Sequence, residues 1–245
     1  MGFFRGPNIV TDSLLSAYDF GSPWSYPSQS SPGGTDPVFK DVVGGNDMTV
    51  KGSPTFNIVG YMGMGYMTFS LSGAQATEYC ICNPFPFPTT ELTVEIWHRM
   101  VNQSSTQGIM SYAVSGDDNE SLMFWNGNSG NGPWSFYGPT GAVSTGINTT
   151  NGAWVQLVRT DVRSSGAVKG YVNGTQEYSG TLAAGTNFTS GGALVIGQES
   201  DSVGGGFSSS QCFRGNIGLI RIYSKALSGD EVSQNFEAQR QRYGI

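Results

Sequence analysis

The sequence predicts an all-β fold, a two-sheet antiparallel jelly-roll sandwich with a short C-terminal helix. Glycine supplies 36 of the 245 residues and only 12% are charged, a composition typical of short strands joined by many turns. Many segments alternate apolar and polar residues or form short apolar runs between clusters of glycine, asparagine and serine. Sandwiches of this size usually fold as one unit, so we expect residues 1–245 to form a single domain, with 1–12 as a possible N-terminal extension.

The strand pattern is clearest in several separate segments. In residues 92–98, a period of two places Leu92, Val94 and Ile96 on one face, which we expect to point into the core. The dipeptide Asn173-Gly174 favours the type I′ turn of a two-residue hairpin. The segments with the clearest pattern are residues 14–20, 66–71, 92–100, 108–114, 121–125, 154–159, 168–172, 193–197 and 217–223.

One helix is expected near the C-terminus, over residues 229–240. Ser228 can accept a hydrogen bond from the backbone of Glu231 while the Glu231 side chain reaches back, which forms a capping box. Val232 and Phe236 lie four residues apart and share a helix face that packs on the sandwich. On the other side of the helix, solvent should surround Glu237, Arg240 and Arg242.

The charge balance argues against two classes of partner. A formal net charge of -6 repels a nucleic-acid backbone, and no cluster of lysine and arginine overrides it. No apolar run is as long as the roughly 18 residues that a membrane-spanning helix needs. Residues 1–7 lack the apolar core of a secretion signal. We therefore expect neither nucleic-acid binding nor membrane insertion.

The cysteines do not indicate a disulfide framework, because Cys80, Cys82 and Cys212 cannot all pair within one chain. His98 is the one histidine, and together with Cys80 and Cys82 it shows no recognised zinc-ligand spacing. Buried free thiols are the favoured interpretation.

Two acidic segments stand out in a chain with only 18 acidic residues. Residues 117–120 are Asp-Asp-Asn-Glu, and Glu199 and Asp201 open a glycine-rich loop directly after a predicted strand. Calcium takes six to eight oxygens from carboxylates, amides, backbone carbonyls and water, held by flexible loops. The two segments therefore suit a shared calcium ion, although the same residue types also suit ordinary turns on a solvated rim.

Both acidic segments resemble the calcium loops of the pentraxins. Residues 198–211 followed by 213–218 resemble the first of these loops, and residues 111–113 leading into 118–120 and 122–124 resemble the second. The resemblance spans residues 69–227 and implies a laminin-G/pentraxin sandwich of the concanavalin A-like type. It also implies one calcium site formed by the side chains of Asp118, Asn119, Glu199 and Asp201, the backbone carbonyl of Ser200, and Gln211 on the ligand-facing side.

Two positions depart from the pentraxin pattern. Ser208 stands where the pentraxin loop has a further acidic ligand for a second calcium, which leaves three carboxylates. With one Ca²⁺ the net charge of such a site is about -1, whereas with two Ca²⁺ it is about +1 and there are too few oxygen ligands for both ions. We therefore expect one firmly held ion and a second that is weak or absent. Glu95 stands where a strand-bridging cysteine would be expected, which fits a chain made in a reducing compartment.

The ends of the chain show a second resemblance. Residues 6–12, 25–27 and 226–245 resemble laminin-G-like modules in structural proteins of marine tailed bacteriophages. This resemblance implies a virion protein that is made in the host bacterial cytoplasm and displayed extracellularly. Its partners would be other virion subunits or further copies of itself.

Three aromatic residues, Trp125, Trp134 and Phe136, have two open interpretations. They suit the sandwich core, and they also suit stacking against a sugar ring. Trp125 and Trp134 are therefore candidate ligand-binding residues together with Gln211.

Three functions from different classes compete. The first is a calcium-dependent, lectin-like module that binds cell-surface glycans or other anionic ligands. The second is an architectural virion role, as capsid decoration or fibre component, in which calcium only joins two loops. The third is a glycoside hydrolase, but a retaining enzyme needs two carboxylates about 5 Å apart. Glu91 and Glu95 would lie roughly 13 Å apart along one strand, and no catalytic triad is recognisable, so we expect no enzymatic activity.

Overall fold

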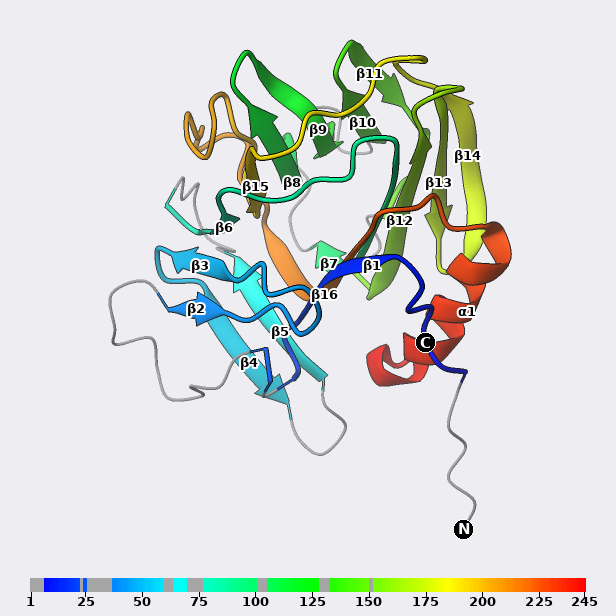
Figure 1. Cartoon of the computed structure of the whole chain (residues 1–245). Coiled ribbons are helices and arrows are strands. Elements are labelled where there is room, and N and C mark those ends of the chain that lie inside the picture. Colours follow the sequence, from blue (N-terminus) through cyan, green and yellow to red (C-terminus); the bar gives the residue numbers. More distant parts are fainter. Residues whose placement is uncertain are drawn as a thin grey trace.

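The computed structural model describes residues 7–22, 24–25, 37–59, 64–69, 77–100, 105–127, 133–149 and 152–245, and over these it forms two antiparallel sheets (Figure 1). Sheet A has the spatial order β14 (Thr175–Thr181), β13 (Ala167–Val172), β12 (Val155–Val162), β7 (Glu91–Met100), β16 (Gly215–Tyr223), β5 (Met64–Phe69) and β4 (Thr55–Val59), with β1 (Leu14–Asp19) also paired to β16. Sheet B has the order β11 (Gly141–Ser144), β10 (Trp134–Gly138), β9 (Asp117–Trp125), β8 (Gln107–Val114), β15 (Ala193–Ile196), β6 (Tyr79–Cys82), β3 (Met48–Lys51) and β2 (Val38–Phe39). The predicted all-β sandwich is confirmed.

The main hydrophobic core lies between the two sheets. Leu92, Val94 and Ile96 of β7 are fully buried in it, as the alternating pattern predicts. The other face of β7 is buried as well, because α1 (Gly229–Gln239) and a short 3-10 helix (Arg240–Tyr243) cover it. On that face, the ring of Trp97 stacks on Phe236 at 5.9 Å and on Tyr243 at 4.3 Å.

A buried polar network holds α1 to sheet A. Glu95 is fully buried and accepts hydrogen bonds from Trp97 Nε1, Gln156 Nε2 and Arg221 Nη1 on one oxygen. Its second oxygen accepts from Asn235 Nδ2 of α1 at 2.9 Å. Since every donor is supplied by the protein, the carboxylate is satisfied without solvent.

The predicted hairpin turn and the predicted helix capping box are both confirmed. Asn173 and Gly174 have φ of 50° and 79°, the left-handed backbone that a type I′ turn requires. Ser228 accepts from the backbone of Glu231 and its own backbone nitrogen donates to that side chain, which completes the capping box. The helix ends at Gln239, one residue before the predicted end.

Near the chain ends, the environment of Arg242 differs from the prediction, and Val10 makes contacts that were not predicted. Arg242 is not surrounded by solvent: its Nη1 donates to Asp19 Oδ2 at 2.7 Å, and its side chain is 16% exposed. Val10, within the predicted N-terminal extension, is packed against α1 and donates to Asn235 Oδ1 at 2.8 Å. Residues 1–6 of that extension lie outside the described part of the chain. Among described residues, neither helix has the length and apolar character needed to cross a membrane.

Candidate functional site

The loop after β15 turns back along the outer face of sheet B. Met110 and Tyr112 of β8 belong to the core, so Ser111 between them faces the opposite side. The Ser111 hydroxyl donates to the backbone carbonyl of Gln198 at 3.0 Å and lies 2.9 Å from the hydroxyl of Ser200. The loop is thus fastened to the middle of β8.

The same loop reaches the turn between β8 and β9. Residues 114–118 and 201–203 line one hollow of about 330 Å³. Gly204 lies over β6 and β15, since a Cβ on it would meet Ile81 Cδ1 at 2.7 Å and Ala193 Cβ at 3.4 Å. The two acidic segments, distant in sequence, therefore meet at one edge of the sandwich.

Glu199 is the most perturbed carboxyl group of this site. It is only 3% exposed, and its Oε2 is buried without a hydrogen-bond partner among the described residues. Burial, then the negative charges of Asp201 and Asp118, raise its pKa to about 7. An enclosed carboxylate near two others is a place where a bound cation would be strongly favoured.

The remaining predicted ligands occupy different positions. Asn119 Nδ2 donates to Asp118 Oδ1 at 2.9 Å, which orients the Asp118 carboxylate. Ser200 is buried, with its hydroxyl engaged by Ser111. Gln211 stands at the far end of the loop, where its backbone carbonyl accepts from Gly108 at 2.8 Å. Gly108 also lies against Glu199, because a Cβ on it would meet that residue. The hydrogen bond from Gly108 to Gln211 therefore holds the end of the loop close to Glu199.

The interpretation of Trp125 and Trp134 as ligand-binding residues is wrong. Both are fully buried, and their rings meet edge to face at 5.6 Å inside the core. Phe136 is fully buried too. No flat indole surface is left at these positions for a sugar, because each large ring contributes its area to the hydrophobic core.

The donor chemistry of the site suits calcium. The groups that meet here are carboxylate, amide and carbonyl oxygens, and a bound cation would satisfy the buried Oε2 of Glu199, which has no hydrogen-bond partner among the described residues. Within the described residues, no three His, Cys, Asp or Glu side chains are grouped closely enough to form a metal centre by themselves. Backbone carbonyls, Asn119 and water would have to complete the coordination sphere, as calcium allows.

The cysteines and the histidine take no part in this arrangement. Cys80, Cys82 and Cys212 are free and buried, as expected for structural thiols. Burial raises the pKa of the Cys80 and Cys82 thiols. His98 is enclosed in the core beside Thr149, and burial lowers its pKa to about 3, so it stays neutral.

Sequence reasoning missed an aromatic pair beside the acidic loop. Tyr79 of β6 and Phe207 of the loop are half-buried, with ring centroids 4.4 Å apart. Phe207 adjoins Gly206, and a Cβ on that glycine would lie 2.8 Å from Asp201 Cβ, so the pair is close to the carboxylates. A single phenylalanine within a loop of glycine and serine was the signal that could have revealed it.

Comparison with known proteins identifies the family. The sequence model of the concanavalin A-like lectin/glucanases superfamily matches residues 72–233. The chain belongs to this superfamily. Human C-reactive protein is 32% identical over 152 residues, which are 61% of this chain and 66% of that protein, slightly less than two thirds of its length. The resemblance to laminin-G and pentraxin modules is thereby confirmed.

Two solved structures show the same fold. The native heptameric SAP-like pentraxin of Limulus polyphemus has a TM-score of 0.55 and 24% identity, covering 63% of this chain and 73% of its own. Domain 4 of AbnA, an extracellular arabinanase of Geobacillus stearothermophilus in complex with arabinotriose, has a TM-score of 0.63 and 17% identity, covering 92% and 98%. The same fold thus occurs in a pentraxin and as one domain of an arabinanase. The superfamily match and the pentraxin relatives support a module that binds carbohydrate or another ligand.

Proposed function

We propose that this protein is a calcium-dependent, lectin-like binding module that holds one Ca²⁺ between residues 117–119 and 199–201. The carboxylates of Asp118, Glu199 and Asp201 supply the charge. The side chain of Asn119, the backbone carbonyl of Ser200 and Gln211 supply further oxygens. When bound, the ion offers open coordination positions to hydroxyl or phosphate oxygens of a surface ligand.

The observation that carries the proposal is the buried, unpartnered Oε2 of Glu199. Burial without a hydrogen bond is costly for a carboxylate, and the nearby charges of Asp118 and Asp201 increase that cost. A divalent cation at this point would reverse the sign of the local electrostatics and stabilise all three carboxylates together.

A binding role without catalysis is the second part of the proposal. Glu95 and Glu91, the acidic pair of β7, have structural partners: Glu95 is enclosed by four donors, and Glu91 Oε2 accepts from the backbone of Ala226 at 3.1 Å. A retaining hydrolase requires two accessible carboxylates about 5 Å apart across the scissile bond. The buried Glu95 is unsuited to that role.

The position of this module on a virion is also a proposal. It rests on the resemblance of the chain ends to phage structural proteins, and it places the protein outside the host cell after synthesis in the bacterial cytoplasm. Copies of itself or other virion subunits would be its partners, and a cell-surface glycan its ligand. The heptameric Limulus relative supports self-association.

An architectural role is the alternative, and the shared hollow between residues 114–118 and 201–203 favours it. An ion there would join two loops of sheet B and could serve stability alone. In that case the protein would decorate a capsid or form part of a fibre and bind no glycan.

Binding to a glycan array, with calcium and then with a chelator, separates these functions. We expect glycan binding that requires calcium and is lost in the Glu199→Gln, Asp201→Asn variant. Glu237→Gln, an exposed substitution on α1, serves as the control and should retain binding. Binding that persists in chelator contradicts the calcium dependence. Thermal stabilisation by calcium with no bound glycan supports the architectural role instead.

A further inference from the structure

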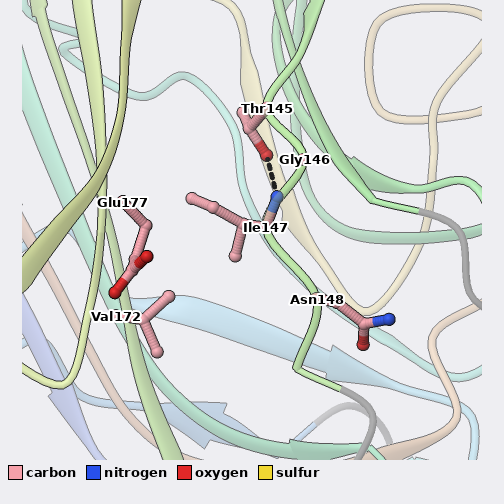
Figure 2. A pocket seen from close by; sticks show the side chains of 6 residues that line it. All are labelled: Thr145, Gly146, Ile147, Asn148, Val172 and Glu177. Carbon is pink, nitrogen blue, oxygen red and sulfur yellow. Dashed lines mark hydrogen bonds between the residues drawn. The ribbon is translucent and has the colours of Figure 1, made fainter.

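A second pocket lies at the other end of the molecule, where residues 145–148 cross the β13–β14 hairpin. Its volume is about 410 Å³, within the range of small-molecule sites. Figure 2 shows Ile147 pointing from its segment toward Val172 and Glu177, which form the opposite wall. In Figure 1, β14 and the orange loop after β15 are on opposite sides of the view, so this pocket is separate from the acidic loops.

The wall formed by residues 145–148 is held rigidly. The backbone of Trp134 exchanges hydrogen bonds with this segment, donating to Ile147 at 2.9 Å and accepting from Thr145 at 3.0 Å. Thr145 Oγ1 also accepts from the backbone nitrogen of Ile147, the bond drawn in Figure 2. Ile147 is buried against Gly170, where a Cβ would come within 2.6 Å of its Cδ1.

The hairpin that forms the opposite wall is equally constrained. Gln156 of β12 binds both turn residues: its carbonyl accepts from Asn173 at 3.0 Å and its side chain accepts from Gly174 at 3.0 Å. The pocket therefore exists before any ligand arrives, so binding would require little ordering of the protein.

A β-bulge directs Glu177 into this pocket. Tyr171 pairs with Gln176 and Gly170 pairs with Tyr178, so Glu177 is the extra residue on β14. Bulges commonly redirect a side chain at a functional position. Among the described residues, the side chain of Glu177 makes no hydrogen bond or ion pair; it is solvent-exposed and is the one charged side chain lining the pocket.

We infer that this pocket binds a neutral, hydroxyl-rich ligand of the size of a monosaccharide unit, without calcium. A carboxylate can only accept hydrogen bonds, so the ligand must donate them. Val172 is partly exposed and provides an aliphatic surface for the C–H groups of a sugar, whereas Ile147 lines the pocket but is only 4% exposed. Gly146 leaves open space because a Cβ on it would meet no atom within 4 Å. The negative charge of Glu177 disfavours acidic sugars. This inference goes beyond the calcium site and does not depend on it.

Amide chemical-shift mapping of the intact chain tests the inference in the presence of EDTA. The probes are glucose, galactose and arabinose, with sialic acid as the acidic sugar and ethanolamine as the amine. We expect a neutral monosaccharide to give saturable shifts at Gly146, Val172 and Glu177, and sialic acid to give none. Glu177→Gln should weaken this binding about tenfold through loss of a charge-assisted hydrogen bond, whereas Glu237→Gln should not change it.

Three outcomes would overturn the inference: no shift at these residues with any neutral monosaccharide, shifts with ethanolamine alone, or sugar shifts that Glu177→Gln leaves unchanged. The Glu199→Gln, Asp201→Asn variant distinguishes the two sites. It should lose the proposed calcium binding and keep the sugar-induced shifts, so that either site can fail without the other.

Discussion

Gly108 of β8 lies directly against Glu199: a Cβ on Gly108 would be 2.7 Å from the backbone nitrogen of Glu199 and 2.8 Å from its Cβ. This close approach is possible only because glycine has no side chain. The carboxylate of Glu199 is near enough to Asp118 of the β8–β9 turn for that negative charge to contribute to its raised pKa. One residue without a side chain is thus needed for the acidic loop to follow the sheet.

Substitution of this glycine should displace the loop. Gly108→Ala is expected to lower stability by about 1–3 kcal/mol through overpacking and to weaken calcium binding, because Glu199 must shift. Gly229→Ala is the matched control, since a Cβ there meets nothing closer than 3.8 Å. Thermal melting in chelator followed by a calcium titration measures both effects, and equal calcium affinity in Gly108→Ala and wild type would contradict this explanation.

The raised pKa of Glu199 predicts a pH dependence of the metal-free protein. The folded carboxyl titrates at about 7, whereas an unfolded glutamate titrates at about 4.3. Between these values the folded state holds a proton that the unfolded state has released, so this group lowers stability as the pH rises and the cost persists above pH 7.

Thermal melting of wild type and Glu199→Gln in chelator, over a range of pH, tests whether Glu199 lowers stability as the pH rises. Glutamine carries no charge at any pH, so the variant should match wild type below about pH 4, exceed it increasingly up to about pH 7, and keep a constant advantage above that. The depressed pKa of His98 affects both proteins equally and cancels in the difference. A difference in melting temperature that stays constant with pH would show that Glu199 is not perturbed.

The aromatic pair should contribute to ligand binding without contributing to ion binding. Phe207→Ala removes the ring whose centroid lies 4.4 Å from that of Tyr79, and loss of a stacking surface beside the ion should weaken glycan binding severalfold, by about 1 kcal/mol. Calcium affinity should remain that of wild type. Unchanged glycan binding in Phe207→Ala would remove this pair from the proposed ligand surface.

The network beneath α1 should dominate the stability of sheet A. Glu95→Ala leaves the buried guanidinium of Arg221 without its carboxylate, which lies 3.2 Å away, and should cost about 3–5 kcal/mol. Chemical denaturation measures the loss, with Glu237→Gln as the exposed control. A loss below about 1 kcal/mol would mean that solvent reaches Arg221 and replaces the missing partner.

Local patterns allowed the strands, the hairpin and the helix cap to be predicted from the sequence. Period-two alternation identified the core face of β7, and the Asn173-Gly174 dipeptide identified a turn, because both depend on neighbours in the chain. The burial of Trp97 could not be predicted this way, since it depends on helical residues more than a hundred positions later. The burial of Trp125 and Trp134 likewise follows from the packing of two sheets.

The candidate calcium site was predictable in its residue types and not in its geometry. Asp118, Glu199 and Asp201 were recognisable from two loop motifs. Their convergence depends on Gly108 and Ser111 of β8, which allow the loop to turn back over the sheet, and no local pattern predicts these contacts between β8 and the loop. Tyr79 was missed for the same reason, because its partner Phe207 is distant in sequence.

Calorimetric titration of the protein with calcium tests the central claim most directly. The account predicts one ion per chain for wild type and no binding heat for the Asp118→Asn, Glu199→Gln variant, with chelator reversing the wild-type signal. Equal binding by the variant and wild type, or no binding by either, would contradict the proposal that these two acidic loops share a calcium ion.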